Sequence, residues 1–391
     1  MKKPFFWRLL FILALFLSTT ASGFTQSLEL NGKAGLLMDA KSGNILFEYN
    51  IDEALPMASI TKIMTLVLVL EAVDQGRVSL TDLVTTSKHA ASMGGSQVWL
   101  DIGEQLPLKE IIYAIAVGSA NDAAVAVAEY LAGSEQAFVA MMNARAQELE
   151  LSSTEFSNAS GLPPSQFHGG AQVMSARDVA NLTRHALSVP LMLDFVSTYD
   201  YTMRSQSTKR PQLWNYNKLL RRYQGVDGMK TGFTTEAGYC LAATAKRDDL
   251  RLIAVVLGSV NDANRENDVR KLIDFGFRKY TSHVILSQGT KVGEIQIRQG
   301  EPEIVAAVLT SDLAVTVLRG DESKITTEIR YSNDLNLPLV KGTPIGVIQA
   351  VIDDDSIGSA EITIAVDVKR GSFPKLIVHM ANAMIDSLLE F

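Results

Sequence analysis

The spacing of apolar residues changes character several times along the chain. Short apolar runs at residues 35–39 and 45–49 flank a polar turn that contains Gly43, and this pattern predicts a β-hairpin. Residues 59–73 are good helix formers without Gly or Pro, which predicts a helix there. Helical patterns then dominate to about residue 200.

Beyond Gly225 the pattern returns to strand. Apolar runs at 239–245 and 252–257 enclose a charged turn, and residues 264–280 predict a closing helix. Strands at both ends with helices between predict one α/β domain, over residues 28–280, whose sheet joins strands that are distant in the chain.

The segment 283–370 is a series of short strand patterns separated by Gly, Asn and Asp turns. Apolar and polar residues alternate within several of them, as expected for strands with one buried face. We predict a small all-β sandwich or barrel. Its predicted strands are residues 294–298, 304–309, 314–318, 326–331, 346–351 and 361–368. The acidic run Asp353-Asp354-Asp355 is interpreted as a solvated turn, because it lacks the alternating ligands of a cation site.

Each end of the chain carries a further pattern. Residues 1–23 hold basic residues, a short apolar run and then small residues, which predicts a secretory signal peptide. An uncleaved anchor is the alternative, but the apolar run is short against the roughly 20 residues of a membrane span. Residues 375–391 predict an amphipathic helix that lies on a membrane surface; packing on its own domain or on a second subunit is the alternative.

Composition excludes several classes of function. A net charge of −7 argues against a nucleic-acid partner. The single cysteine, Cys240, excludes an intramolecular disulfide and is interpreted as a small buried residue. The five histidines are scattered without metal-ligand spacing, so we expect no metal and no other cofactor. Trp99 and Trp214 are interpreted as packing residues, with a place in the lining of a substrate cleft as the alternative for Trp99.

Two short motifs combine a serine with a second polar residue. In Ser59-Ile60-Thr61-Lys62 the helical spacing i, i+3 places the Lys62 amine where it can take the proton of Ser59. In Ser119-Ala120-Asn121 the hydroxyl could relay a proton and the amide could hold a substrate amide. For each serine the alternative is a helix N-cap, which is the commoner reason for a serine before a helix.

The third motif, Lys230-Thr231-Gly232, occurs once, in the strand-like region beyond Gly225 and ahead of the strand predicted at 239–245. The alternative for it is an ordinary edge strand that ends in a turn. Lys230 and Thr231 offer a cation and a hydroxyl to a carboxylate. Gly232 lets a substrate backbone lie beside the strand, and the N–H groups of Phe233 and Ser59 could form an oxyanion hole. Thr234 continues the same edge, so we include it among the substrate-binding residues.

The order and coarse spacing of the three motifs resemble the serine penicillin-binding and β-lactamase class. The flanking residues resemble one family in it, the D-alanyl-D-alanine carboxypeptidases, which are low-molecular-mass penicillin-binding proteins. The stretches that carry this resemblance are residues 56–65, 94–96, 158–162, 175–178 and 226–234.

The resemblance implies a fold and a reaction. The fold is a β-lactamase/transpeptidase-like domain, with a five-stranded antiparallel sheet flanked by helices, followed by a small all-β domain and an amphipathic helix. Ser59 would attack the carbonyl between two terminal D-alanines of a peptidoglycan stem peptide, with Lys62 as base and Ser119 as relay. Lys230 and Thr231 would hold the terminal carboxylate, and β-lactams would acylate Ser59. The implied location is the periplasmic face of the inner membrane.

The chain departs from some relatives, which carry His where Ser160 and Phe233 stand here, so no role of those histidines is transferred. Three other functions remain open. A β-lactamase would need a Glu-x-x-Leu-Asn setting for its deacylating water, which is missing after the second motif. A D,D-endopeptidase acting on cross-links would use the same residues. A mainly structural wall-associated protein would not need the intact motifs.

Overall fold

A computed structural model describes residues 28–164, 170–204, 210–332 and 335–371. The predicted signal peptide at 1–23 and the predicted tail helix at 375–391 lie outside these residues. No helix in the described ranges is long and apolar enough to cross a membrane.

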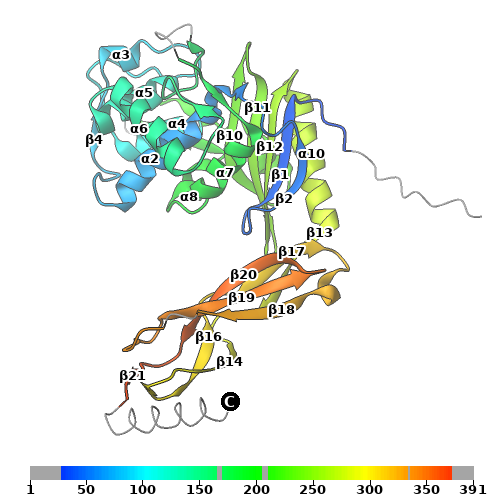
Figure 1. Cartoon of the computed structure of the whole chain (residues 1–391). Helices are drawn as coiled ribbons and strands as arrows, with labels where there is room; N and C mark the ends of the chain where they lie inside the picture. The colour runs from blue at the N-terminus through cyan, green and yellow to red at the C-terminus, as the bar shows by residue number, and fades with distance from the viewer. Residues whose placement is uncertain (1–27, 165–169, 205–209, 333–334, 372–391) are drawn as a thin grey trace, which may run out of the picture.

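The first domain is built on an antiparallel sheet with the strand order β10-β11-β12-β1-β2 (Figure 1). Its strands are β1 Ala34–Asp39, β2 Ile45–Tyr49, β10 Val226–Thr234, β11 Gly238–Arg247 and β12 Leu250–Ser259. The predicted hairpin is therefore confirmed. So is the joining of distant strands, because β1 pairs with β12, with Leu37 opposite Ala254.

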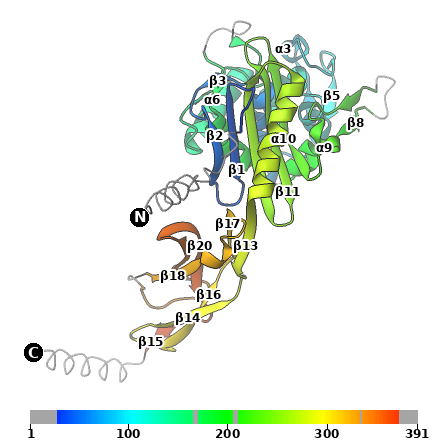
Figure 2. The same ribbon diagram turned by 90° about the vertical axis from the view of Figure 1, so that its right-hand side faces the viewer.

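Both faces of this sheet are buried. Leu37 and Leu252 pack against α10 (Asp262–Lys279), which lies along one face (Figure 2). Leu36 and Met38 point to the other face, where most of the other helices pack. This explains why β1 and β12 have nearly continuous apolar sequences: a strand between two helical layers has no solvent face.

The helical layer surrounds one central helix, α2 (Lys62–Asp74). Residues from Lys62 through Leu70 are all buried, so α2 has no polar face. The helices that pack on it are α4 Leu108–Ala116, α5 Asn121–Ala132, α6 Glu135–Glu148, α7 Ala176–Ala186 and α8 Met192–Val196. Two short helices lie further out: α3 Lys88–Ala91 packs on α5, and α9 Leu219–Arg222 packs on β10. Short strand pairs connect them: β3 Leu55–Pro56 with β7 Val173–Met174 and β6 Thr154–Glu155, β4 Leu83–Thr85 with β5 Gln105–Pro107, and β8 Asp200–Thr202 with β9 Gln212–Trp214.

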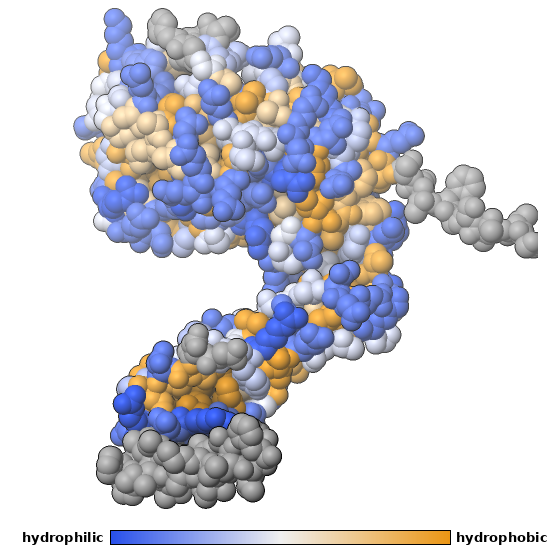
Figure 3. Space-filling view, in the orientation of Figure 1, coloured by the Kyte–Doolittle hydropathy of each residue, from blue (hydrophilic) through white to orange (hydrophobic). Residues whose placement is uncertain are grey.

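The second domain is all β, as expected. Its main sheet has the order β14-β16-β20-β19-β18, and β13 pairs with β17. The strands are β13 Tyr280–Leu286, β14 Lys291–Gln296, β15 Gly300–Glu301, β16 Ile304–Leu309, β17 Leu313–Leu318, β18 Thr326–Tyr331, β19 Pro344–Ile352, β20 Asp355–Ile364 and β21 Lys369–Arg370; a 3-10 turn, η3, spans Glu322–Lys324. β13 follows directly on α10, and the molecule is narrow at this junction (Figure 3).

Two predictions need correction. The last strand was expected at 361–368, but β20 begins at Asp355, because Asp353 and Asp354 adopt positive φ angles of 50° and 70° and form a tight turn between β19 and β20. Trp99 and Trp214 are not buried: they are 68% and 53% exposed, and Trp214 packs at the surface, edge to face against Tyr199 with ring centroids 5.9 Å apart. Cys240 is fully buried, as expected, and burial raises the pKa of its thiol to about 11.

Candidate active site

Ser59 lies in a 3-10 turn, η1 (Ala58–Thr61), that leads directly into α2. Among the described residues neither η1 nor α2 has a side-chain hydrogen bond at its N-cap, so Ser59 is not a helix cap. The Nζ atom of Lys62, one turn further on, lies 3.0 Å from the Ser59 Oγ atom. The predicted proximity of hydroxyl and amine is therefore present in the structure.

Lys62 is fully buried and has three hydrogen-bond acceptors. Besides Ser59, its Nζ atom donates to Asn121 Oδ1 at 2.7 Å and to the carbonyl oxygen of Ser160 at 2.6 Å. Burial, reinforced by the positive charge of Lys230, holds the pKa of Lys62 well below its ordinary value, although Asp122 acts in the opposite direction. A general base must be neutral, and the lowered pKa makes the neutral form of this amine more populated than in an exposed lysine.

Ser119 lies between α4 and α5 with a φ angle of 55°, in the left-handed region. The Nζ atom of Lys230, on β10, donates to the Ser119 Oγ atom at 2.9 Å and to the Thr231 carbonyl oxygen at 3.0 Å. Burial, with a smaller contribution from Arg265, lowers the pKa of Lys230 to about 7. The first motif therefore forms one lysine–serine pair, and the second and third motifs together form another.

Asn121 is already engaged at both ends of its amide. Its Oδ1 atom accepts from Lys62, and its Nδ2 atom donates to the Gly94 carbonyl oxygen at 2.7 Å. In this structure the residue expected to hold a substrate amide supports Lys62.

Gly232 brings strand β10 against the turn that carries Ser59. A Cβ atom at this position would lie 2.6 Å from the Met57 carbonyl oxygen and 3.2 Å from the Ser59 nitrogen. Only glycine permits this close approach. Within the described strands β10 pairs with β11 alone, so the edge from Thr231 to Phe233 borders the cleft. Thr234 lies beyond this lining, and its hydroxyl oxygen accepts from the Ala237 N–H at 3.0 Å.

The cleft between these elements has a volume of about 250 Å³. Its lining includes residues from all three motifs and, at the mouth, the half-exposed rings of Tyr216 and Phe233. The motif residues that line it are Ser59, Ser119, Thr231, Gly232 and Phe233. Lys62, Asn121 and Lys230 lie buried behind it.

Sequence reasoning missed several residues of the cleft lining, namely Tyr216, Lys218, Tyr239, Asp262 and Arg265. Of these, Arg265 is the one whose charge and burial suggest a role. It lies in the first turn of α10, is 4% exposed and pairs with Asp262, while its Nε atom has no partner among the described residues. The signal was an arginine on the apolar face of that helix, in line with Val269 and Leu272. A guanidinium beside the Thr231 hydroxyl in one cleft suits a carboxylate.

The fold and the two lysine–serine pairs define the class: a serine acyl-transfer enzyme of the penicillin-binding and β-lactamase type. The described residues hold no cluster of His, Cys, Asp and Glu suited to a metal ion. Comparisons with known proteins narrow the class. The family model described as D-alanyl-D-alanine carboxypeptidase matches residues 20–261, and the model described as penicillin-binding protein 5, C-terminal domain, matches residues 280–370.

Relatives match over most of their length. D-alanyl-D-alanine carboxypeptidase DacF of Bacillus subtilis is 35% identical, over 89% of this chain and 89% of the relative, and DacC of Escherichia coli is 33% identical, over 90% and 89%. The crystal structure of penicillin-binding protein 5 from Haemophilus influenzae, 32% identical, covers 88% of this chain and 98% of that chain with a TM-score of 0.76. Penicillin-binding protein D2 of Listeria monocytogenes in its ampicillin-bound form, 33% identical, covers 64% and 98% with a TM-score of 0.58. The chain belongs to the D-alanyl-D-alanine carboxypeptidase family and is a serine hydrolase.

Proposed function

We propose that this protein removes the terminal D-alanine from peptidoglycan stem peptides through an acyl-enzyme on Ser59. The observation that carries the proposal is the 3.0 Å contact between Lys62 Nζ and Ser59 Oγ, with the pKa of Lys62 held low. A serine hydroxyl becomes an effective nucleophile only when a base takes its proton, and here the base is in place.

In the acylation step neutral Lys62 takes the Ser59 proton while Oγ attacks the carbonyl carbon between the two D-alanines. The N–H groups of Ser59 and Phe233 stabilise the resulting oxyanion. When the C–N bond breaks, Ser119 donates a proton to the departing amine of D-alanine. As Ser119 gives up its proton, its oxygen takes the proton that Lys62 removed from Ser59, so Lys62 is neutral again and the proton lost by Ser59 accounts for the one gained by the leaving group. Lys230 keeps its own proton and stabilises the Ser119 oxygen by donating to it.

In the deacylation step a water molecule attacks the ester carbonyl and gives a proton to Lys62. The ester C–O bond then breaks, and the proton returns from Lys62 to Ser59 Oγ. The products are the shortened peptide with a new carboxyl end and the free enzyme. A β-lactam follows the first step by opening its amide ring, so that its leaving amine stays attached to the acyl group.

We assign the terminal carboxylate of the substrate to the Thr231 hydroxyl and Arg265, both in the lining of the cleft. Lys230 is buried against Ser119, so it contributes through its positive charge rather than by direct contact. The edge formed by Gly232, Phe233 and Thr234 takes the substrate backbone, and Asn121 holds Lys62 and borders the substrate amide.

We further infer that the protein is exported and acts at the periplasmic face of the inner membrane as a peripheral protein. The pattern of residues 1–23 supports export, and the amphipathic pattern of residues 375–391 supports attachment to the membrane surface.

The proposal is tested by measuring free D-alanine released from a peptide that ends in D-Ala-D-Ala. We expect release by the native protein and, for Ser59→Ala, a loss of at least about a thousandfold. Ser188→Ala, an exposed serine remote from the cleft, is the matched control and should retain activity. A folded native protein that releases no D-alanine, or a Ser59→Ala variant as active as the control, would overturn the proposal.

A further inference from the structure

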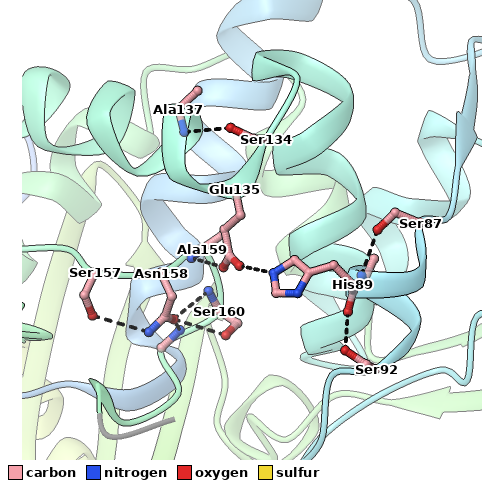
Figure 4. A network of polar contacts seen from close by, with 12 residues as sticks. Ser87, His89, Ser92, Ser134, Glu135, Ala137, Ser157, Asn158, Ala159 and Ser160 are labelled. Carbon is pink, nitrogen blue, oxygen red and sulfur yellow. Dashed lines mark hydrogen bonds and ion pairs between the residues drawn. The ribbon is translucent and has the colours of Figure 1, made fainter. Parts of the chain in front are cut away.

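A carboxylate outside the cleft, that of Glu135, joins two segments that are distant from each other in the chain (Figure 4). Its Oε1 atom accepts a hydrogen bond from the Ala159 N–H at 3.0 Å, and its Oε2 atom lies 2.7 Å from His89 Nε2. The side chain of Glu135 is 11% exposed, whereas that of His89 is 45% exposed. Glu135 therefore contacts one partner in the interior and one at the surface.

The first segment is the loop of residues 158–161. Its shape is fixed by Asn158, whose Oδ1 atom accepts from the N–H groups of Ser160 at 3.1 Å and Gly161 at 2.7 Å. The Ala159 carbonyl oxygen accepts from Thr65 on α2, and the Ser160 carbonyl oxygen accepts from Lys62. The N–H that Glu135 holds is thus one residue away from the carbonyl that holds Lys62.

The second segment runs from α3 to Gly95. Ser87 caps α3, accepting from the Ala90 N–H at 2.9 Å, and His89 projects from this helix toward Glu135. A few residues later the Gly94 carbonyl oxygen accepts from Asn121 Nδ2, and the other end of that amide accepts from Lys62. This segment therefore fixes Asn121, whose Oδ1 atom is a second acceptor of Lys62 besides the Ser160 carbonyl oxygen.

The second segment also lies close against Asn121 at Gly95. A Cβ atom on Gly95 would lie 2.9 Å from Asn121 Nδ2 and 3.7 Å from a methyl group of Leu162. A displacement of the second segment therefore moves Asn121, and a displacement of the loop of residues 158–161 moves the Ser160 carbonyl oxygen; both groups accept from the Lys62 amine. Glu135 is the side chain that ties both segments to the start of α6.

An acidic residue in the first turn of a helix ordinarily stabilises only its own helix. The capping of α6 is carried by Ser134, whose Oγ atom accepts from the Ala137 N–H at 3.1 Å (Figure 4). Glu135 directs both carboxylate oxygens to residues outside α6, to Ala159 and to His89. Glu135 therefore links α6 to two other segments. We call its contacts with His89 and the Ala159 N–H the Glu135 clamp.

We propose that Glu135 is a positioning residue for acylation: with His89 and the Ala159 N–H it holds the loop of residues 158–161 and the segment after α3 so that Ser160 and Asn121 keep the Lys62 amine aimed at Ser59. This inference rests on the proposed role of Lys62 as the general base. Glu135 does not line the cleft, so its loss affects the rate of acylation rather than the binding of the acylating molecule.

The test measures acylation of the full chain by a fluorescent penicillin, separating the limiting rate from the half-saturating concentration, beside the melting temperature. For Glu135→Ala we expect a limiting rate about ten- to a hundredfold lower, because small displacements of catalytic groups cost factors of this size. The half-saturating concentration should stay within about twofold, since the cleft is unchanged. Glu135→Gln keeps an acceptor for the Ala159 N–H and a polar partner for His89, so it should restore most of the rate.

Ser134→Ala is the matched control, because it weakens the same end of α6 without touching the clamp. We expect it to lower the melting temperature and to acylate at the native rate. His89→Ala removes the other end of the clamp and leaves α6 intact. It should slow acylation about two- to tenfold, as for the loss of one hydrogen bond. If Glu135→Ala does not fold, the rate of His89→Ala alone tests the positioning role.

Native acylation rates in both Glu135→Ala and His89→Ala would overturn the inference. So would a rate that falls equally in Glu135→Ala, Glu135→Gln and Ser134→Ala in step with the melting temperature, because that pattern indicates only a structural role. A native protein that is not acylated at all would overturn the proposed function and this inference with it. Failure of the Glu135 inference alone would instead leave the native protein fully acylated.

Discussion

The ammonium group of Lys230 lies 2.9 Å from the hydroxyl of Ser119, behind the cleft and 3% exposed. Lys62 stands in the same relation to Ser59, at 3.0 Å. Each serine of the site therefore has its own buried lysine, and the positive charge of Lys230 helps to keep Lys62 neutral. This coupling has consequences for activity and stability that can be measured.

Replacing Lys230 with Met should move the pH dependence of acylation. Loss of the nearby positive charge removes a cause that lowers the pKa of Lys62, so that pKa rises. Lys62 must be neutral to act as the base, so the acidic limb of the pH–rate profile for β-lactam acylation should move to higher pH. An acidic limb that stays in place would show that Lys62 is not the titrating group.

The same variant should change how stability depends on pH. The pKa of Lys230 is about 7 in the folded protein and 10.5 in the unfolded reference, so the unfolded chain binds more protons between these values. The free energy of unfolding of the native protein should therefore rise with pH across this window, with Lys230 adding a slope of up to about 1.4 kcal/mol per pH unit. In Lys230→Met this slope should be smaller, as measured by denaturant unfolding at several pH values. If the free energy of unfolding depends on pH equally in both proteins, the pKa of Lys230 is not lowered by its burial.

Arg265→Ala should weaken recognition of a free terminal carboxylate. A hydrogen bond to a charged group is worth about 1.5–3 kcal/mol, so kcat/KM for a D-Ala-D-Ala peptide should fall about ten- to a hundredfold. The same peptide with a terminal amide is the control, since it offers no charge to Arg265. If the substitution lowers kcat/KM equally for acid and amide, Arg265 does not bind the carboxylate.

Gly232→Val should disable the site by displacing the turn that carries Ser59. The added atoms would collide with the Met57 carbonyl oxygen, which lies 2.6 Å from the position of a Cβ atom. We expect a loss of about 1–3 kcal/mol in the free energy of unfolding, typical of overpacking, and a fall in acylation rate of about a hundredfold. Native-like acylation by the folded variant would show that activity does not depend on the close contact between β10 and η1.

Much of the fold could be predicted from the chain itself. The hairpin of β1 and β2, the strands β11 and β12 and the helix α10 follow from local apolar spacing and turn residues, which report burial directly. The start of β20 could not be predicted as reliably, because the positive φ angles of Asp353 and Asp354 are a backbone property that aspartate permits but does not require. The exposure of Trp99 likewise depends on tertiary context.

For the site, the motifs predicted the contact of Ser59 with Lys62, because both lie within one turn of the same helical segment. They did not predict that the Ser160 carbonyl holds Lys62, since every residue has a carbonyl group and the sequence does not mark the one that faces a cavity. Arg265 and Glu135 were missed for a related reason. The partners of Glu135, His89 and Ala159, are distant in the chain. Arg265 pairs with nearby Asp262, but only the packing of α10 brings it beside Thr231 in the cleft.

The most direct test of the account is to identify the residue that forms the acyl-enzyme. The native protein and the Ser59→Ala variant are incubated with a penicillin, and the intact masses and the modified peptide are determined by mass spectrometry. We expect one adduct per native chain, located on Ser59, and none on the variant. An adduct on Ser119 or another residue, or none on the folded native protein, would contradict the assignment of Ser59 as the nucleophile.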